Sequence, residues 1–152
     1  GVLMKLGAYG IIRVGMVIVP EGAENWMPVL ITLGTVNVLY GAVSAMSQTD
    51  LKYIIGYSSV SHMGYVLMGI ATLDRIGVGG AVLQMFSHGI MTALMFLLVG
   101  AIYDRTHTRD ISVLKGLFSR MGVTGFFFAI APRSTARQFI DPRTPTAIIL
   151  LN

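Results

Sequence analysis

The sequence has 152 residues, of which 54% are hydrophobic and only 12% are charged, and its formal net charge is +4. Soluble domains usually carry about 25% charged residues, so this composition excludes a soluble enzyme, a disordered region and a secreted scaffold. The mean hydropathy of +0.72 indicates instead a chain that is dissolved in lipid. Because the sequence has no cysteine, it also excludes a disulfide framework, a cysteine-bound iron–sulfur cluster and a thiolate zinc site.

Apolar stretches follow one another along the chain, and a membrane-spanning helix needs about 20 such residues. Four strong stretches and a weaker fifth cover residues 1–20, 27–47, 51–73, 76–103 and 111–131. Pro20 closes the first stretch, and Trp26 and Pro28 mark the start of the second. The apolar runs are continuous rather than alternating, which disfavours strands. We therefore predict an all-α integral membrane protein with four to five transmembrane helices.

Glycine is abundant, with 18 residues, as is typical of membrane helices that pack closely. The clearest candidates for close helix contacts lie in the fourth stretch and are Gly77, Gly79, Gly80 and Gly89. A phosphate-binding loop is disfavoured, because this glycine run lacks both a preceding strand and a partner lysine.

The connections between the stretches differ in charge. Residues 21–26 carry Glu21 and Glu24 without a basic residue, and the third connection pairs Asp74 with Arg75. The second and fourth connections are basic, with Lys52, Arg105, Arg109, Lys115 and Arg120. The positive-inside rule places these two connections on the cytoplasmic side or its equivalent. The basic residues are therefore explained by the orientation of the chain in the membrane. For this reason we expect no nucleic-acid partner.

Three ionisable side chains lie deep inside the apolar stretches: Lys5, His62 and His88. Arg13 lies in the first stretch as well, but we expect its long side chain to reach toward Glu21 and the membrane interface. Such a residue costs about 2.5–3.5 kcal/mol to insert and usually faces a bundle interior or water. Imidazole changes charge near neutral pH, and a lysine removed from water gives up its proton more easily. The sequence therefore predicts either a proton path or, in the simpler interpretation, polar contacts that hold neighbouring helices together.

Other polar residues recur at helical spacing beside these groups. Gln84, His88 and Thr92 are four residues apart and form one stripe, and Ser58, Ser61 and Tyr65 lie near His62. Hydroxyl, amide and imidazole groups can donate and accept protons in turn, so we expect Ser58, Ser61, Gln84 and Thr92 to support the path. The remaining histidine, His107, lies in a basic connection without a second ligand, so no metal site and no catalytic residue are predicted.

Several runs of residues resemble the antiporter-like subunits of respiratory complex I. The first three are Leu3–Gly10 (LMKLGAYG), Gln48–Lys52 (QTDLK) and Ile55–Gly64 (IGYSSVSHMG). Two further runs, Gln84–Gly89 (QMFSHG) and Tyr103–Asp110 (YDRTHTRD), are similar to the chain M, or subunit-4, type of NADH-quinone oxidoreductase. The resemblance extends from residue 1 to about residue 131.

The resemblance implies part of a larger antiporter-like helical bundle of fourteen helices, with residues 1–131 covering roughly the eighth to the twelfth. Lys5 would match the central lysine that relays protons between two half-channels, and His88 and His62 would line the hydrated axis. The chain would then belong to a proton-translocating subunit whose neighbours are other membrane subunits and the lipid bilayer. NADH, flavin, iron–sulfur clusters and quinone would be bound by other subunits, so we expect no cofactor in this chain.

The expected location is the bacterial plasma (inner) membrane, with the mitochondrial inner or thylakoid membrane as the alternative. The family's earlier lysine and glutamate would lie before Gly1. Residues 132–152 depart from the family pattern, because they hold three of the five prolines and three arginines. Proline and arginine are unsuited to a spanning helix, so this tail is expected to be frameshifted or poorly packed.

Two alternatives remain open at this point. The first is a homologous subunit of a multi-subunit cation/proton antiporter or of a membrane-bound hydrogenase. The second is a structural membrane fragment without transport, which would be favoured if Lys5 were exposed at a helix end.

Overall fold

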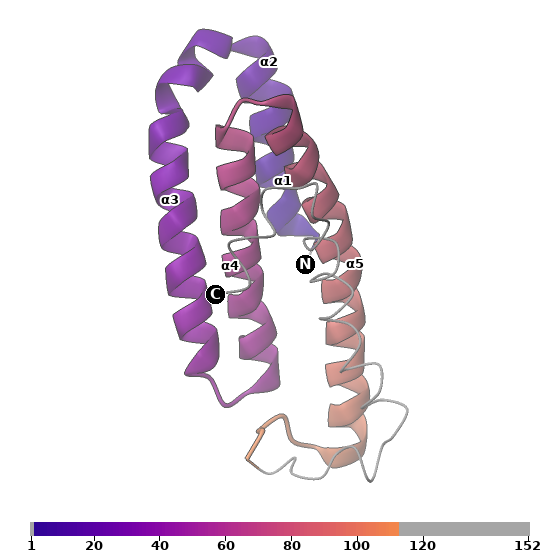
Figure 1. Ribbon diagram of the computed structural model, residues 1–152. Coiled ribbons are helices and arrows are strands. Elements are labelled where there is room, and N and C mark those ends of the chain that lie inside the picture. Colours follow the sequence, from indigo (N-terminus) through magenta and orange to yellow (C-terminus); the bar gives the residue numbers. More distant parts are fainter. Residues whose placement is uncertain (1, 113–152) are drawn as a thin grey trace.

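The computed structural model describes residues 2–112, which fold into helices that run side by side (Figure 1). In chain order these are α1 (Leu3–Gly10), the π-helix η1 (Ile11–Gly15), α2 (Met16–Ile18), α3 (Pro20–Met46), α4 (Leu51–Ala71) and α5 (Arg75–Thr106). The helices α3, α4 and α5 are long and apolar enough to cross a membrane. The all-α membrane fold predicted from the sequence is therefore confirmed.

The first predicted span, residues 1–20, is helical from Leu3 to Ile18 but is divided by the π-helix. The third and fourth predicted spans, 51–73 and 76–103, agree more closely with the structure. They correspond to α4 and α5, which begin directly after Asp50 and Asp74. The fifth predicted span, 111–131, lies outside the described residues apart from residues 111 and 112, and the tail 132–152 lies outside them completely.

The start of α3 differs from the sequence-based expectation. Residues 21–26 were expected to form a connection, but the helix begins at Pro20 and continues through Pro28. Proline suits the first position of a helix, because its φ is already helical and its missing N–H would have no partner there. Glu21 and Glu24 are exposed on the first turns, so their charge does not oppose the helix.

Close backbone contact joins α3 to α4, and glycines make it possible. A Cβ atom added to Gly64 would lie 2.6 Å from the carbonyl oxygen of Gly34, and one added to Gly41 would lie 2.6 Å from the amide nitrogen of Ser61. Of the glycines singled out from the sequence, Gly77 makes such a contact, since a Cβ atom added to it would lie 2.9 Å from the carbonyl oxygen of Gly69. Nothing in the described residues lies within 4 Å of a Cβ atom added to Gly79, Gly80 or Gly89, so their role in close helix contacts stays a prediction.

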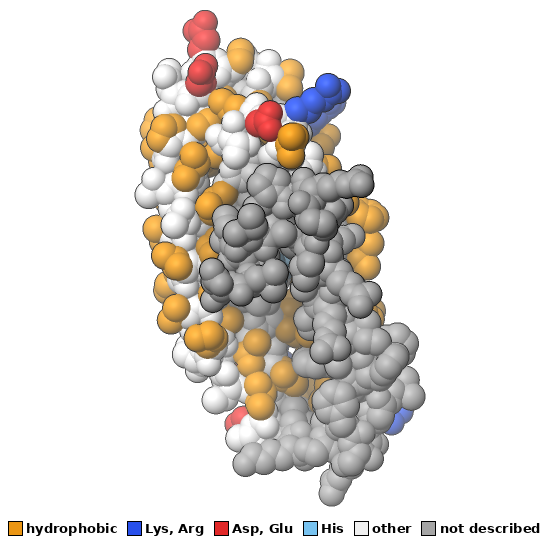
Figure 2. All heavy atoms as spheres, viewed as in Figure 1, with side chains coloured by type: hydrophobic (Ala, Val, Ile, Leu, Met, Phe, Trp, Pro, Cys, Tyr) orange, Lys and Arg blue, Asp and Glu red, His pale blue; other side chains and the backbone are white. Residues whose placement is uncertain are grey.

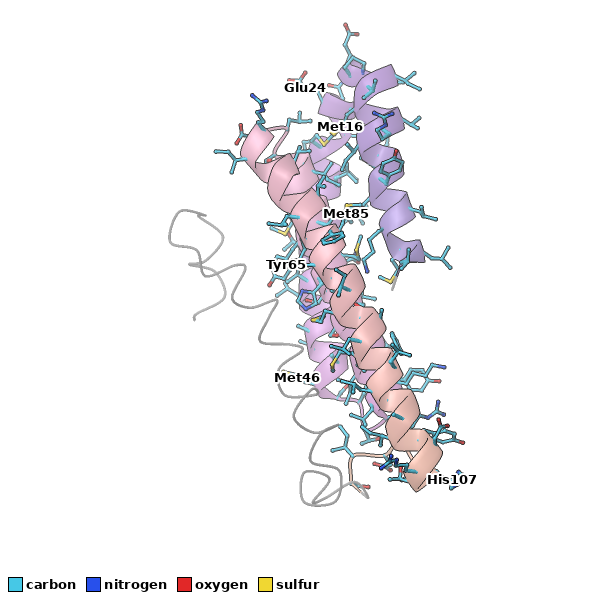
Figure 3. The ribbon with its side chains drawn as sticks, turned by 90° about the vertical axis from the view of Figure 1, so that its right-hand side faces the viewer. Met16, Glu24, Met46, Tyr65, Met85 and His107 are labelled. Carbon is cyan, nitrogen blue, oxygen red and sulfur yellow. The ribbon has the colours of Figure 1, made fainter. Side chains whose placement is uncertain are left out.

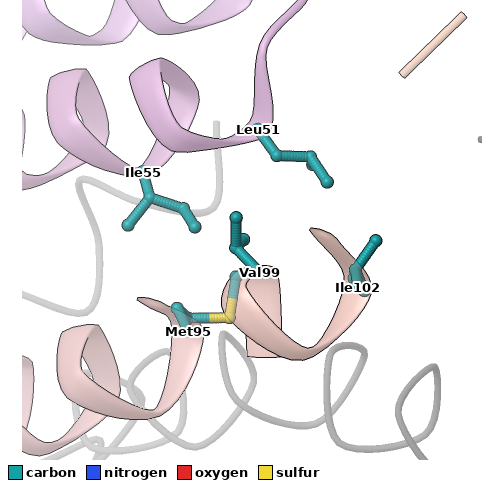
Figure 4. Close-up of a cluster of buried hydrophobic side chains, with 5 residues drawn as sticks. All are labelled: Leu51, Ile55, Met95, Val99 and Ile102. Atoms are coloured by element: carbon teal, nitrogen blue, oxygen red, sulfur yellow. The ribbon is translucent and has the colours of Figure 1, made fainter. Parts of the chain in front are cut away.

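Apolar side chains join α4 to α5 and to α1. One cluster lies between the beginning of α4 and the end of α5 and contains Leu51, Ile55, Met95, Val99 and Ile102 (Figure 4). A second cluster, closer to the other end, joins α1, α4 and α5 through Ala8, Met63, Val66, Ile70 and Ala81. The two clusters leave a middle section of the α4–α5 interface that is filled by other side chains.

Charged side chains lie at the two ends of the visible face, with hydrophobic side chains along the length between them (Figure 2). At one end, Asp50 Oδ2 is 3.7 Å from Arg109 Nε, and the amide of Leu51 donates to the carbonyl of Arg109. The connection before α4 and the one after α5 therefore lie together, as the charge pattern predicts. Which side of the membrane they face stays a prediction.

We expect two substitutions of Asp50 to separate its two contacts. Its carboxylate accepts from the amide of Lys52 at 2.8 Å, which caps α4, and it also pairs with the partly exposed Arg109. Asp50→Asn keeps a capping oxygen and should cost about 0.2–1 kcal/mol. Asp50→Ala also removes the cap and should cost about 1 kcal/mol more. Unfolding in detergent micelles measures both, and equal losses would contradict the capping role.

Candidate functional site

Lys5 is buried although it lies on a short helix with exposed neighbours. Its side chain is only 8% exposed, whereas Leu3 and Leu6 are 79% and 58% exposed. Ala8, one turn along α1, is buried in the apolar cluster with Met63 and Val66 of α4. Because residues three apart share a helix face, the contact of Ala8 with α4 also turns Lys5 toward the helices behind it.

The Lys5 side chain reaches His88 in the middle of α5. Lys5 Nζ lies 2.7 Å from His88 Nδ1, within hydrogen-bond distance, and His88 is 1% exposed. An ammonium group has three donors and no acceptor. When Lys5 is charged, His88 Nδ1 must therefore accept this hydrogen bond, and a neutral His88 then carries its proton on Nε2.

The polar stripe predicted on α5 is confirmed as a buried face. Gln84 and Thr92 are 3% and 0% exposed, one turn before and one turn after His88. The Thr92 hydroxyl donates to the carbonyl of His88 at 2.6 Å. Its oxygen also lies 3.3 Å and 3.4 Å from the two ring nitrogens of His88. The stripe places polar groups between the two apolar clusters.

His62 of α4 completes the cluster. Its ring centroid is 4.9 Å from that of His88 and 6.4 Å from that of Tyr65. Its Nδ1 lies 3.4 Å from Nε2 of Gln84. Three helices thus bring one amine, two imidazoles, an amide and a hydroxyl together, and we call Lys5, His62, Gln84, His88 and Thr92 the polar cluster.

The structure does not join the predicted serines to the polar cluster. Ser58 donates to the carbonyl of Ile55 at 2.9 Å, within its own helix. Ser61 donates to the carbonyl of Val38 at 3.1 Å and so contacts α3. Both hydroxyls therefore make helix contacts of the kind that the simpler interpretation of the sequence describes, and their part in a proton path stays a prediction.

The polar cluster lies at mid-height in the bundle. At 1.5 Å per helical residue, His62 is about 16 Å and about 14 Å from the two ends of α4. Tyr65 and Met85, which neighbour His62 and Gln84 in the sequence, lie between Glu24 at one end and His107 at the other (Figure 3). The cluster is therefore placed where a bilayer would be least polar.

The chemistry of the polar cluster is that of proton donors and acceptors. Within residues 2–112, no three His, Cys, Asp or Glu side chains are grouped so as to hold a metal ion. Each buried side-chain nitrogen and oxygen in this part of the chain has a hydrogen-bond partner. A buried amine beside two imidazoles can pass a proton from group to group without a net gain of charge.

One feature near the site was not predicted from the sequence. The helix that carries Lys5 widens into the π-helix Ile11–Gly15, two turns beyond Lys5. Single π-turns occur frequently at functional sites. The only signal in the sequence is a pair of glycines, Gly10 directly before the π-helix and Gly15 as its last residue. Glycines of this kind are also common in ordinary membrane helices.

Comparison with known proteins identifies relatives of this chain. A family model described as NADH:quinone oxidoreductase/Mrp antiporter, TM, matches residues 1–136. The chain is 46% identical over 130 residues to NAD(P)H-quinone oxidoreductase chain 4 1 of Synechococcus elongatus, covering 86% of this chain and 24% of the relative.

Two other cyanobacterial proteins are similar to the same degree. The identity is 48% over 128 residues with chain 4 2 from Thermosynechococcus vestitus, covering 84% of this chain and 24% of the relative. It is 49% over 121 residues with chain 4 from Gloeobacter violaceus, covering 80% of this chain and 23% of the relative. The chain thus spans about a quarter of the length of the relatives that it matches.

Proposed function

Because this chain belongs to the NADH:quinone oxidoreductase/Mrp antiporter transmembrane family, we propose that it is part of a proton-translocating subunit of an NADH:quinone oxidoreductase. The family and the three long apolar helices make it a multi-pass protein of a plasma or thylakoid membrane. The observation that carries the proposal is the buried contact of 2.7 Å between Lys5 Nζ and His88 Nδ1.

The proposed proton step begins at Lys5. Its ammonium group gives a proton to His88 Nδ1, which leaves a neutral amine and an imidazolium. The imidazolium then releases its Nε2 proton to the next acceptor along the path. His88 is then neutral with its proton on Nδ1, where it can donate a hydrogen bond to the lone pair of the neutral Lys5 amine. The cycle closes when a new proton reaches Lys5 and His88 exchanges its Nδ1 proton for one on Nε2, which together restore the first state.

His62 supports this step as the next titratable group. Its ring centroid lies 4.9 Å from that of His88, so a positive charge on one imidazole disfavours a positive charge on the other. The pair of imidazoles therefore takes up one additional proton more readily than two. This repulsion favours onward movement of each proton instead of its storage in the polar cluster.

The redox reaction is proposed to take place in partner subunits. The relatives are named NAD(P)H-quinone oxidoreductase chain 4, which implies neighbouring chains in a membrane complex. NADH, flavin, iron–sulfur clusters and quinone would be held by those neighbours. This chain would contribute proton movement alone, because its buried polar groups exchange protons and do not carry electrons.

Two observations favour this proposal over its alternatives. The identities of 46–49% are to quinone oxidoreductase chains, which favours the oxidoreductase over the antiporter or hydrogenase subunit. Lys5 is 8% exposed, whereas a structural fragment without transport was expected to expose it. Burying an amine beside two imidazoles costs stability, and a role in proton transfer gives a reason for that cost.

His88→Gln should lower proton translocation by about a hundredfold, because removal of a proton-transferring side chain typically costs a factor of this size. The measurement is the initial rate of proton uptake by sealed vesicles that contain a complete oxidoreductase carrying this segment. His107→Gln is the matched control, since His107 is exposed at the end of α5. Unchanged proton uptake in His88→Gln would overturn the proposal.

A further inference from the structure

Gln84 is a buried amide that the proton step described above does not use. It is 3% exposed and lies on the α5 face that carries His88 and Thr92. Its side chain crosses to α4, where Nε2 lies 3.4 Å from His62 Nδ1. The amide nitrogen of glutamine can donate hydrogen bonds and cannot accept them, so this contact has a direction.

We propose that Gln84 is a positioning residue that holds neutral His62 with its proton on Nε2 and its Nδ1 free to accept. This inference deepens the proposed function, on which it rests, because it concerns regulation of the same polar cluster. Charged Lys5 imposes the same arrangement on His88 through the contact of 2.7 Å at Nδ1. Both imidazoles then receive a hydrogen bond at Nδ1 and carry their exchangeable proton on Nε2.

Gln84 carries no charge, and we infer that this is as important for His62 as its hydrogen bond. A carboxylate at this position would accept a hydrogen bond from His62 Nδ1 and would hold His62 as an imidazolium. With ring centroids 4.9 Å apart, a permanently charged His62 would oppose the arrival of a proton on His88. The amide orients His62 without holding a proton there, so the proton on His88 stays mobile.

The test is ¹⁵N solid-state NMR of the full 152-residue chain, labelled at histidine and placed in lipid bilayers. The chain has three histidines, so spectra of His62→Gln, His88→Gln and His107→Gln assign each signal. Neutral His62 is expected to show a protonated Nε2 and a bare Nδ1. A protonated Nδ1 with a bare Nε2 in the unsubstituted chain would overturn the inference without any variant.

Two variants of nearly the same size test the role of the amide. Gln84→Met removes the donor, and the His62 signals should split between the two neutral forms. Gln84→Glu reverses the hydrogen bond, and the signal of the bare His62 nitrogen should be lost. Gln48→Glu, which makes the same change in the connection before α4, should leave it unchanged. A His62 spectrum unaltered by both Gln84 variants would overturn the inference.

These outcomes are independent of proton translocation. If His62 shows the expected form while His88→Gln translocates normally, the proposed function fails and the positioning by Gln84 stands. If His62 shows the opposite form while His88→Gln is inactive, the positioning fails and the function stands.

Discussion

Lys5→Ala in a complete oxidoreductase that carries this segment is expected to lower proton translocation by this subunit by about a hundredfold, while the helices still assemble. The amine contacts His88 Nδ1 at 2.7 Å and is buried, so its removal takes away the first donor in the proposed step. Assembly should persist, because Ala8 rather than Lys5 holds α1 in the apolar cluster. Protons moved per electron, measured in sealed vesicles, give the result.

Lys52→Ala is the matched control for this substitution. Lys52 is exposed at the beginning of α4, at an end of the bundle, and its removal should leave the proton-to-electron ratio unchanged. A normal ratio in Lys5→Ala would contradict the role of Lys5. A lower proton-to-electron ratio in both variants, together with poor assembly of both, would show that the two lysines are needed for folding and would also contradict the role of Lys5.

Gly64→Ala should markedly lower the free energy of unfolding, because Gly64 lies at the close contact between α3 and α4. The added methyl group would lie 2.6 Å from the Gly34 carbonyl oxygen and 2.9 Å from the Val38 amide nitrogen, so α3 and α4 must separate. Overpacking of this kind costs about 1–3 kcal/mol. The free energy of unfolding in mixed micelles measures the loss.

Gly56→Ala is the control on the same helix. Nothing in the described residues lies within 4 Å of a Cβ atom at Gly56. Alanine is favoured over glycine in a helix interior by about 0.5–1 kcal/mol, so this variant should be as stable as the unsubstituted chain or slightly more stable. Equal stability of Gly64→Ala and Gly56→Ala would contradict the close α3–α4 contact.

The long helices could be predicted from the sequence because continuous apolar runs are specific for membrane spans. The beginning of α3 could not, because Glu21 and Glu24 are typical of a connection and also of an exposed first turn. The glycines of the α3–α4 contact could not be singled out from the sequence for a different reason. Glycines occur in all the spans, and only the arrangement of the helices decides that Gly41 and Gly64 face a neighbour.

The candidate site was predicted in part. A spacing of four residues places Gln84, His88 and Thr92 within about 80° of one another around the helix, and the structure confirms this stripe. Ser61 directly precedes His62, so the two side chains point about 100° apart around the axis of α4. Ser61 therefore faces α3, where it contacts Val38. The contacts of His62 with Gln84 and of His88 with Lys5 join different helices, and local spacing carries no information on such contacts.

The central claim is that Lys5 and His88 act as one unit in moving protons, and a double-mutant cycle tests it most directly. Proton uptake per electron is measured for Lys5→Met, His88→Gln and the double variant in the complete oxidoreductase. Residues that act as a unit are strongly non-additive, so the double variant should translocate no fewer protons than either single variant. Independent losses that multiply in the double variant, or normal uptake in either single variant, would contradict the claim.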